Sequence, residues 1–256
     1  MNYKRLLMVL LLAGLAAGVQ AQQRPVNQPP AGFTALFNGK DLTGWRGRQP
    51  NYNPATEAAL PKAELDAKQA EWNAARDLHW KVDTAKGEIV SDGESPHLAT
   101  IKNYDNFEMY VDWLMVSNNG DSGIYLRGYP QVQIWDPSNA RELRNGADRG
   151  SGALWNNAAT NPGKFPLVKT DNPIGSWNTL KIKMIGSRVW ISMNDKVTVD
   201  GQVLDNYFTG RGSPTPLPLV AQGPIELQTH GSEIRFRNVF VREIPEAEAR
   251  AELAKF

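Results

Sequence analysis

Three polar residues near the C-terminus alternate with apolar ones in a short segment. From Ile225 to His230, apolar or small side chains separate Glu226, Gln228 and His230. Because a strand sends successive side chains to opposite faces, one face meets a core and the other carries a carboxylate, an amide and an imidazole. A fully solvated strand face would show the same alternation, although Lys and Thr are more usual there. The segment is therefore a candidate functional face.

Polar side chains alternate in the same way in other predicted strands. Tyr125 and Arg127 share one side of a strand, Gln133 and Trp135 share one side of the next, and Asp112 lies on a third. If these strands form one sheet, their combined face suits a sugar. Flat aromatic rings cover the apolar C–H face of a sugar, and amide, guanidinium and carboxylate groups hydrogen-bond to its hydroxyls.

Each of these residues also has a structural alternative. Arg127 could pair with Asp112 or Glu226 across strands, a contact worth about 0.2–1 kcal/mol. Trp135 could belong to the core, and Asp121, in an Asn-Gly-Asp-Ser-Gly turn, could satisfy turn amides only. A structural role is enough to explain each residue considered alone, whereas the occurrence of all of them together favours a functional site.

The remaining histidines are weaker candidates. His79 follows a predicted helix, where a cation suits the helix C-terminus. His97 lies in a Ser-Pro-His segment near Asp92 and Glu94. We expect both imidazoles at the surface, without a catalytic role.

The elements that must position these residues are mostly short strands. From Trp80 onward, alternating segments are separated by turn signals such as Asn194-Asp195. This spacing predicts an all-β sandwich or jelly roll instead of βαβ units. We find no P-loop, no Gly-x-Gly-x-x-Gly after a strand and no internal repeat.

Residues 51–78 interrupt this pattern. From Pro61 the segment is rich in Ala, Glu, Lys and Gln, which favour helix. We expect one inserted helix that packs on the edge of a domain spanning 32–245. A short helix over 246–256 is expected to close the chain.

The composition limits the kinds of partner. The 256 residues carry a formal net charge of +1, with 41% hydrophobic and 21% charged residues. These fractions are ordinary for a globular protein, and no basic run or acidic tail points to nucleic acid or an anionic membrane.

The N-terminus has the features of a signal peptide. Lys4 and Arg5 precede an apolar stretch from Leu6 to Val19, and cleavage is expected after Ala21. An uncleaved anchor is the alternative, although the stretch is short for a spanning helix. We therefore expect a signal peptide over 1–21, a flexible leader over 22–31, and a periplasmic or secreted protein. With no cysteine, the chain can form neither a disulfide nor a lipidated N-terminal cysteine.

Several motifs, in this order, resemble the 3-keto-disaccharide hydrolase domain family, long known as a domain of unknown function. They are GFTALFNGKDLTGW (Gly32 to Trp45), NNGDSGIYLR (Asn118 to Arg127), VQIWD (Val132 to Asp136), SGALW (Ser151 to Trp155), Trp177-Asn178 and GPIELQTHGSEIRFRNV (Gly223 to Val239). The resemblance runs from about Phe33 to Ile244. It implies a concanavalin-A-like jelly roll that cleaves glycosides already oxidised at C3 of the sugar.

The resemblance also implies roles for individual residues. His230 or Glu226 would be the base or a metal ligand, and Arg127 would stabilise the oxyanion. A divalent metal could replace Arg127 as the electrophile. The groups expected to hold the sugar are Asp121, Tyr125, Gln133, Trp135, Gln228 and Asp112.

This chain departs from the family pattern at two of these positions. Asp121 stands where the family has Asn, and Asp112 stands where we associate a family Glu. The sequence thus predicts an exported hydrolase or lyase of 3-keto-glycosides. The alternative is a non-catalytic sugar-binding module on the same fold, with Trp135 and Tyr125 as stacking platforms.

Overall fold

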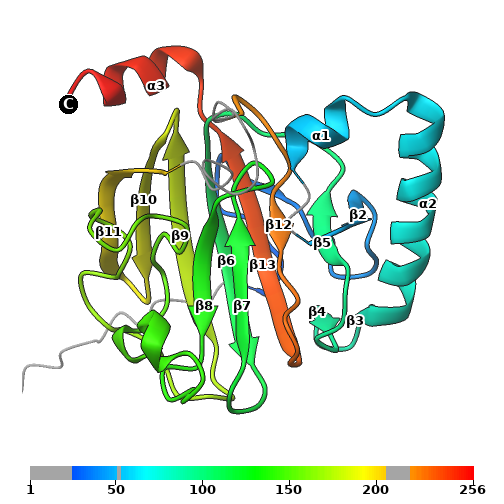
Figure 1. Cartoon of the computed structure of the whole chain (residues 1–256), viewed down its shortest axis with the longest axis horizontal. Coiled ribbons are helices and arrows are strands. Elements are labelled where there is room, and N and C mark those ends of the chain that lie inside the picture. Colours follow the sequence, from blue (N-terminus) through cyan, green and yellow to red (C-terminus); the bar gives the residue numbers. More distant parts are fainter. Residues whose placement is uncertain (1–24, 51–52, 206–219) are drawn as a thin grey trace, which may run out of the picture.

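The strands form two antiparallel sheets that face each other. The computed structural model describes residues 25–50, 53–205 and 220–256. The predicted signal peptide, residues 1–21, lies outside them. The larger sheet has the order β11-β10-β9-β6-β13-β4-β3, with β1 beside β13, and the smaller has the order β2-β5-β12-β7-β8 (Figure 1). The structure is thus the concanavalin-A-like sandwich that the sequence predicts.

The eight-stranded sheet is built from five strands of six to ten residues and three shorter ones. Its strands are β1 (Thr34–Ala35), β3 (Trp80–Asp83), β4 (Glu88–Ser91), β6 (Phe107–Met115), β9 (Asn178–Ile185), β10 (Arg188–Met193), β11 (Lys196–Val203) and β13 (Ile234–Glu243). The five-stranded sheet contains β2 (Trp45–Arg48), β5 (His97–Thr100), β7 (Asp121–Tyr125), β8 (Gln131–Trp135) and β12 (Glu226–Leu227).

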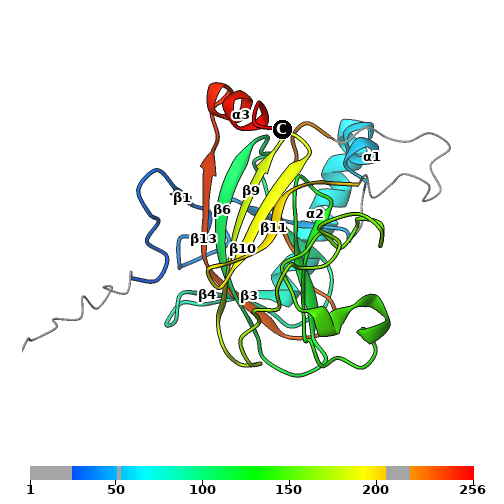
Figure 2. The ribbon, with the colours of Figure 1, turned by 90° about the vertical axis from the view of Figure 1, so that its left-hand side faces the viewer.

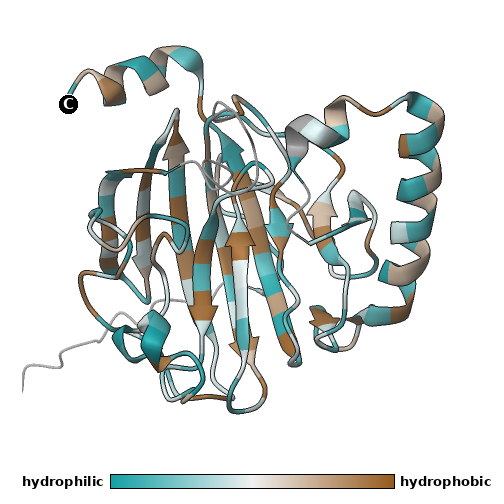
Figure 3. Ribbon diagram, viewed as in Figure 1, coloured by the Kyte–Doolittle hydropathy of each residue, from teal (hydrophilic) through white to brown (hydrophobic). Residues whose placement is uncertain are grey.

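The core lies between the sheets and is filled by alternate residues of the strands. Val111 and Trp113 of β6 and Ile124 of β7 are at most 2% exposed. Figure 3 shows the same alternation as hydrophobic and hydrophilic bands along the strands. Burying each such side chain contributes about 1.5–3 kcal/mol, so the alternation determines which face of each sheet turns inward.

The predicted insertion is observed as two helices, α1 (Pro54–Ala58) and α2 (Lys62–His79). Helix α2 packs beside β2 at the edge of the five-stranded sheet (Figure 1). Asn73 accepts a hydrogen bond from the Gly47 amide at 3.0 Å, and a Cβ at Gly47 would overlap the carbonyl of the buried Trp72. Glycine at position 47 therefore permits the close approach of helix and strand.

The other helices are short. Two 3₁₀ turns, η1 (Leu143–Asn145) and η2 (Ala147–Arg149), follow β8, and α3 (Glu246–Leu253) follows β13. Figure 2 shows α3 above the layer formed by β13, β6, β9 and β10. No helix among residues 25–50, 53–205 and 220–256 is long and apolar enough to cross a membrane.

Three local expectations differ from the structure. The segment at His97 is a strand, β5, and not a loop, whereas the expected strand from Ile225 to His230 is regular only over Glu226–Leu227. Residues 25–31, expected to be flexible, are anchored through Asn27. Its amide donates to the Asn238 side chain at 2.7 Å, and its side chain donates to the Gly87 carbonyl at 2.9 Å.

Candidate active site

The outward face of the five-stranded sheet is polar because its strands pair in one register. Tyr125 of β7 stands opposite Glu226 on one side and Gln131 on the other, and Gly123 stands opposite Gln133. The pairing continues beyond β12, where the backbone N–H of Gln228 donates to the Gly123 carbonyl at 2.9 Å. Residues of the consecutive strands β7 and β8 therefore share one surface with those of the distant segment that begins with β12, as the alternation predicts.

A pocket of about 210 Å³ opens on this face. It is lined by Asp121, Tyr125, Gln131, Gln133, Trp135, Glu142, Trp155, Asn156, Gln228 and His230. Six of the side chains predicted for the site are among them: His230, Asp121, Tyr125, Gln133, Trp135 and Gln228. Glu226, Arg127 and Asp112 do not line the pocket.

Three glutamines form the floor of the pocket. The Gln131 amide nitrogen donates to Gln228 at 2.6 Å, to Gln133 at 3.0 Å and to the Ser122 carbonyl at 3.1 Å. Gln131, Gln133 and Gln228 are at most 8% exposed. A network of this kind holds each amide in one orientation, and such amides suit the hydroxyl groups of a sugar.

An imidazole–carboxylate pair lies at the mouth of the pocket. His230 Nδ1 is 2.8 Å from Asp121 Oδ2, and Gln133 donates to Asp121 Oδ1 at 2.6 Å. The hydrogen bond that His230 donates to the Asp121 carboxylate raises the pKa of His230, and the charge of Glu142 acts in the same direction. Asp121 therefore contacts side chains of the site and does not serve turn amides alone. Such a pair can take up and return a proton.

Aromatic rings form one wall. Trp135 and Trp155 meet edge to face with centroids 5.4 Å apart, and Trp135 Nε1 donates to the Gly150 carbonyl at 2.9 Å. Lys164 lies over the Trp155 ring, 3.6 Å from its centroid. Trp155 was not predicted as a site residue because it follows no strand pattern, although it ends the SGALW motif.

Arg127 does not line this pocket, contrary to the place that the sequence predicts for it beside the other site residues. Strand β7 ends at Tyr125, and Arg127 has a φ of 54°, which turns its side chain away from the alternation. Its guanidinium donates to the carbonyls of Asp105 at 2.8 Å and Gly186 at 2.9 Å, and to Asn106 Oδ1 at 3.3 Å. Burial lowers the pKa of Arg127 to about 10. The side chain has a structural role in another part of the molecule.

Asp112 is also misplaced in the prediction, because β6 belongs to the eight-stranded sheet. Its carboxylate accepts hydrogen bonds from Thr179 at 2.6 Å and Asn238 at 2.7 Å, and Arg237 lies 3.5 Å away. These contacts explain the buried carboxylate without a substrate.

Glu226 lies on the predicted face but is covered. It is 1% exposed, with Arg48 Nη1 at 2.6 Å from one oxygen and His97 Nδ1 at 3.3 Å from the other. Glu226 is therefore covered by its partners and does not line the pocket, contrary to its expected place among the groups that contact a substrate. His97 is 1% exposed, contrary to the surface position expected for it. Recognising β2 and β5 as strands would have shown which face of each carries Arg48 and His97, but not that these strands continue the sheet beside β12.

The side chains present do not fit a metal ion. Within the described ranges, no group of three or more His, Cys, Asp or Glu residues is placed to hold one. Asp121 and His230 bind each other, and Glu226 is bound by Arg48 and His97. We therefore derive no step through a metal.

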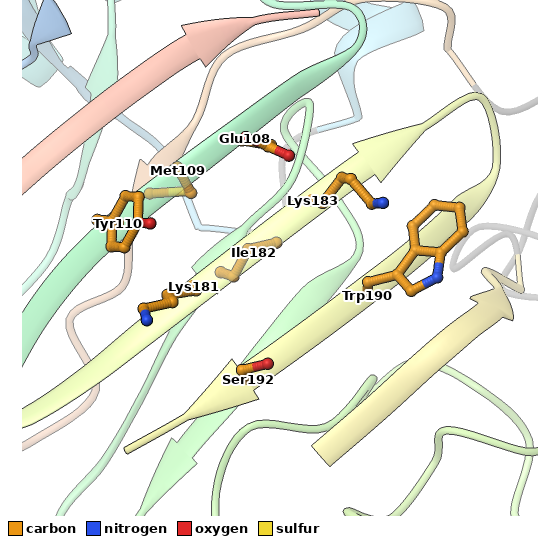
Figure 4. Close-up of a pocket in the computed structure, with 8 residues that line it drawn as sticks. All are labelled: Glu108, Met109, Tyr110, Lys181, Ile182, Lys183, Trp190 and Ser192. Carbon is orange, nitrogen blue, oxygen red and sulfur yellow. The ribbon is translucent and has the colours of Figure 1, made fainter. Parts of the chain in front are cut away.

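A second depression lies on the outer face of the eight-stranded sheet (Figure 4). There Lys181, Lys183 and Glu108 project from neighbouring strands beside Tyr110 and Trp190. Its charged groups pair with residues outside the depression: Lys181 with Asp195 at 2.9 Å, Lys183 with Glu252 at 3.0 Å and Glu108 with Arg242 at 3.0 Å. These are surface ion pairs, and we assign them no chemistry.

Comparisons with known proteins agree on one family. A model of the 3-keto-alpha-glucoside-1,2-lyase-like domain matches residues 32–242. A 3-keto-disaccharide hydrolase of Bacteroides thetaiotaomicron (strain ATCC 29148) is 24% identical over 266 residues, covering 89% of this chain and 83% of the relative.

Solved structures from Parabacteroides distasonis ATCC 8503, provisionally named glycosyl hydrolases, share the fold. One has a TM-score of 0.57 at 23% identity and covers 86% of this chain and 100% of its own. Another has a TM-score of 0.59 at 22% identity, with 84% and 85% coverage. At these identities the likeness establishes the fold alone.

Proposed function

Because the chain belongs to the 3-keto-alpha-glucoside-1,2-lyase-like domain family, we propose that it cleaves the glycosidic bond of a sugar oxidised at C3 by removing the C2 proton. This is a family of glycoside-cleaving enzymes, and a carbohydrate is the substrate it implies. The observation that carries the proposal is the His230–Asp121 pair at the mouth of a polar, aromatic-walled pocket. The name of the Bacteroides relative favours a 3-keto-disaccharide as substrate.

The chemistry needs a base near C2. A ketone at C3 acidifies the C2 hydrogen, so a neutral imidazole can remove it. With Nδ1 of His230 bonded to Asp121, Nε2 is the basic atom, and the carboxylate stabilises the imidazolium that forms. The C–H electron pair passes into the C2–C3 enolate.

The enolate then breaks the bond at C1. Its electrons re-form the C3 carbonyl and a C1–C2 double bond, and the C1 substituent leaves with its oxygen. Water adds hydroxide to C1, and the imidazolium returns a proton to C2, so the net reaction is hydrolysis. This route avoids the two opposed carboxylates that ordinary glycoside hydrolysis uses.

The glutamine floor and the aromatic wall supply positioning. Gln131 fixes the orientation of its neighbours before substrate arrives, which lowers the entropy lost on binding. Trp155 and Trp135 offer ring surfaces for the apolar side of the sugar.

The test uses purified protein and a 3-keto-glucoside in deuterated water. We expect cleavage with deuterium at C2 of the product. His230→Ala should lower kcat about 10²–10⁴-fold, the usual contribution of an acid–base group. His79→Ala is the matched control, because His79 forms a similar pair with Asp92 at 2.9 Å outside the pocket. A chelator should leave the rate unchanged.

Two results would contradict the proposal. Cleavage of a substrate deuterated at C2 with full retention of the label and no isotope effect on the rate would count against proton abstraction there. Saturable binding of the sugar with no cleavage would favour the sugar-binding module instead.

We also propose that the protein is exported to the periplasm or secreted. The support is Lys4 and Arg5 followed by the apolar stretch from Leu6 to Val19. Mass spectrometry of the protein recovered from a bacterial periplasm or culture medium should find an N-terminus at Gln22. An N-terminus at Met1 would overturn this assignment.

A further inference from the structure

A cluster of buried ionisable groups extends the polar face beyond the pocket. Arg48, His97 and Glu226 come from the neighbouring strands β2, β5 and β12, and none is more than 1% exposed. Arg48 also reaches Glu57 of α1, with Nε 2.7 Å from Oε2. We call Arg48, His97 and Glu226 the buried triad.

Burial of this triad is weak evidence that it stabilises the fold. Taking charged groups out of water costs several kcal/mol per ion, and their mutual attraction at best roughly offsets that cost. Apolar side chains of similar volume would serve the fold equally well. Buried ionisable groups beside a pocket are more common at functional sites.

The triad contacts the pocket through Tyr125. The His97 and Tyr125 rings pack with centroids 5.1 Å apart and an interplanar angle of 33°. Glu226 is the direct cross-strand partner of Tyr125. Arg48 and His97 hold Glu226 on both carboxylate oxygens. The triad therefore has one orientation, and it contacts a residue of the pocket, Tyr125.

Tyr125 and Asp121 both line the pocket and lie at opposite ends of β7. They are four residues apart, a distance of about 13 Å along a strand at about 3.3 Å per residue. Removing a proton from C2 and protonating the oxygen that leaves C1 needs groups at two different positions around the sugar ring.

We propose that Tyr125 is the proton donor to the leaving oxygen, held in place by the buried triad. This inference rests on the proposed function. When the C1–O1 bond breaks, the Tyr125 hydroxyl proton passes to O1, which leaves as a neutral alcohol, and a phenolate remains. When water then adds to C1, its second proton returns to the phenolate. In this scheme Glu226, Arg48 and His97 are positioning residues, because they act through Tyr125.

Leaving-group dependence tests the assignment. The substrates are a 3-keto-disaccharide, whose sugar alkoxide needs a proton, and a 4-nitrophenyl 3-keto-glucoside, whose phenolate leaves without one. Tyr125→Phe should lower kcat about 100-fold for the disaccharide and change it little for the nitrophenyl substrate. Glu226→Gln should lower kcat for the disaccharide about 10-fold and leave kcat for the nitrophenyl substrate little changed, because the proton donor is displaced but not lost.

Asp112→Asn is the matched control. Asp112 is another largely buried carboxylate with partners on both oxygens, but it lies in the other sheet. It should affect stability without changing the ratio of the two rates. A merely structural role for Glu226 would give the same result as this control.

Deuterium exchange separates the two proposals. If Tyr125→Phe still places deuterium at C2 while disaccharide cleavage slows, both proposals hold. Equal slowing of both substrates by Tyr125→Phe, or no slowing, overturns the inference and leaves the proposed function intact. If the unmodified protein neither exchanges C2 nor cleaves either substrate, the proposed function itself fails, and with it this inference.

Discussion

At the scale of single residues, chemical type alone does not identify the site. His230–Asp121 and His79–Asp92 are both imidazole–carboxylate pairs, with Nδ1–Oδ2 distances of 2.8 Å and 2.9 Å. Only the first has a carboxylate that also accepts from a pocket amide, that of Gln133. The surroundings of the carboxylate therefore distinguish a candidate base from an ordinary surface pair.

The pH dependence of the rate reports on His230. The base must be neutral, and Asp121 raises its pKa, so kcat/KM should rise with pH through a midpoint above the ordinary histidine value of about 6.5. Asp121→Asn removes the hydrogen-bonding carboxylate and should move the midpoint down towards that value while lowering the plateau. The pH–rate profile of each protein measures this. A midpoint that stays in place in Asp121→Asn would contradict the assignment of His230 as the base.

At the scale of elements, the antiparallel pair β7–β8 builds the floor of the pocket. Gly123 stands opposite Gln133, and a Cβ at position 123 would overlap the Gln131 side chain. The missing side chain leaves the space in which Gln131 reaches Gln228 at 2.6 Å. Position 123 of β7 thus has no side chain, so that the amide of Gln131 on β8 can meet that of Gln228, which follows β12 on the other side of β7.

Gly123→Ala should displace the Gln131 amide. Overpacking of this kind costs about 1–3 kcal/mol of unfolding free energy, and we expect at least about a 10-fold loss of kcat/KM from misplaced positioning groups. Urea denaturation and steady-state kinetics on a 3-keto-glucoside measure the two effects. Val132→Ala is the control, because Val132 is 0% exposed and faces the core; it should lose stability but keep its activity. The same full activity in both variants would show that the amide floor does not position substrate.

At the scale of the whole molecule, Arg127 fastens segments that lie far apart in the chain. Its guanidinium joins Asp105 before β6, Gly186 between β9 and β10, and Val220 before β12. The first two segments flank the eight-stranded sheet and the third leads into the five-stranded one. One side chain thus connects loops of both sheets at the same end of the sandwich.

Arg127→Met should therefore affect stability and not catalysis. Leaving several carbonyls without their donor is expected to lower the unfolding free energy by about 2–5 kcal/mol. The kcat of the folded protein, measured well below its unfolding temperature, should stay unchanged. Arg242→Met provides the contrast: its partners Glu108 and Glu248 form a surface cluster, so its loss should cost about 1 kcal/mol or less. A selective fall in kcat for Arg127→Met would return the arginine to the active site.

The sequence by itself determined which side chains of β7, β8 and β12 share a face. Alternation is a local property of extended backbone, so Asp121 and Tyr125, or Gln133 and Trp135, must point the same way wherever their strands lie. The apolar partners of these residues determined that this face turns outward. This is why most of the pocket could be predicted before any strand was paired.

The tertiary structure alone decided which faces belong to the same sheet and where each strand ends. Asp112 lies in the same alternating pattern of polar and apolar residues as the site residues. Its strand, β6, nevertheless pairs with β9 and β13 and so belongs to the other sheet. Arg127 lies two residues beyond the end of β7, at a positive φ. Arg48 and His97 reach Glu226 because β2 and β5 extend the sheet on its far side. Strand pairing depends on contacts between residues far apart in the chain, and a local pattern does not encode them.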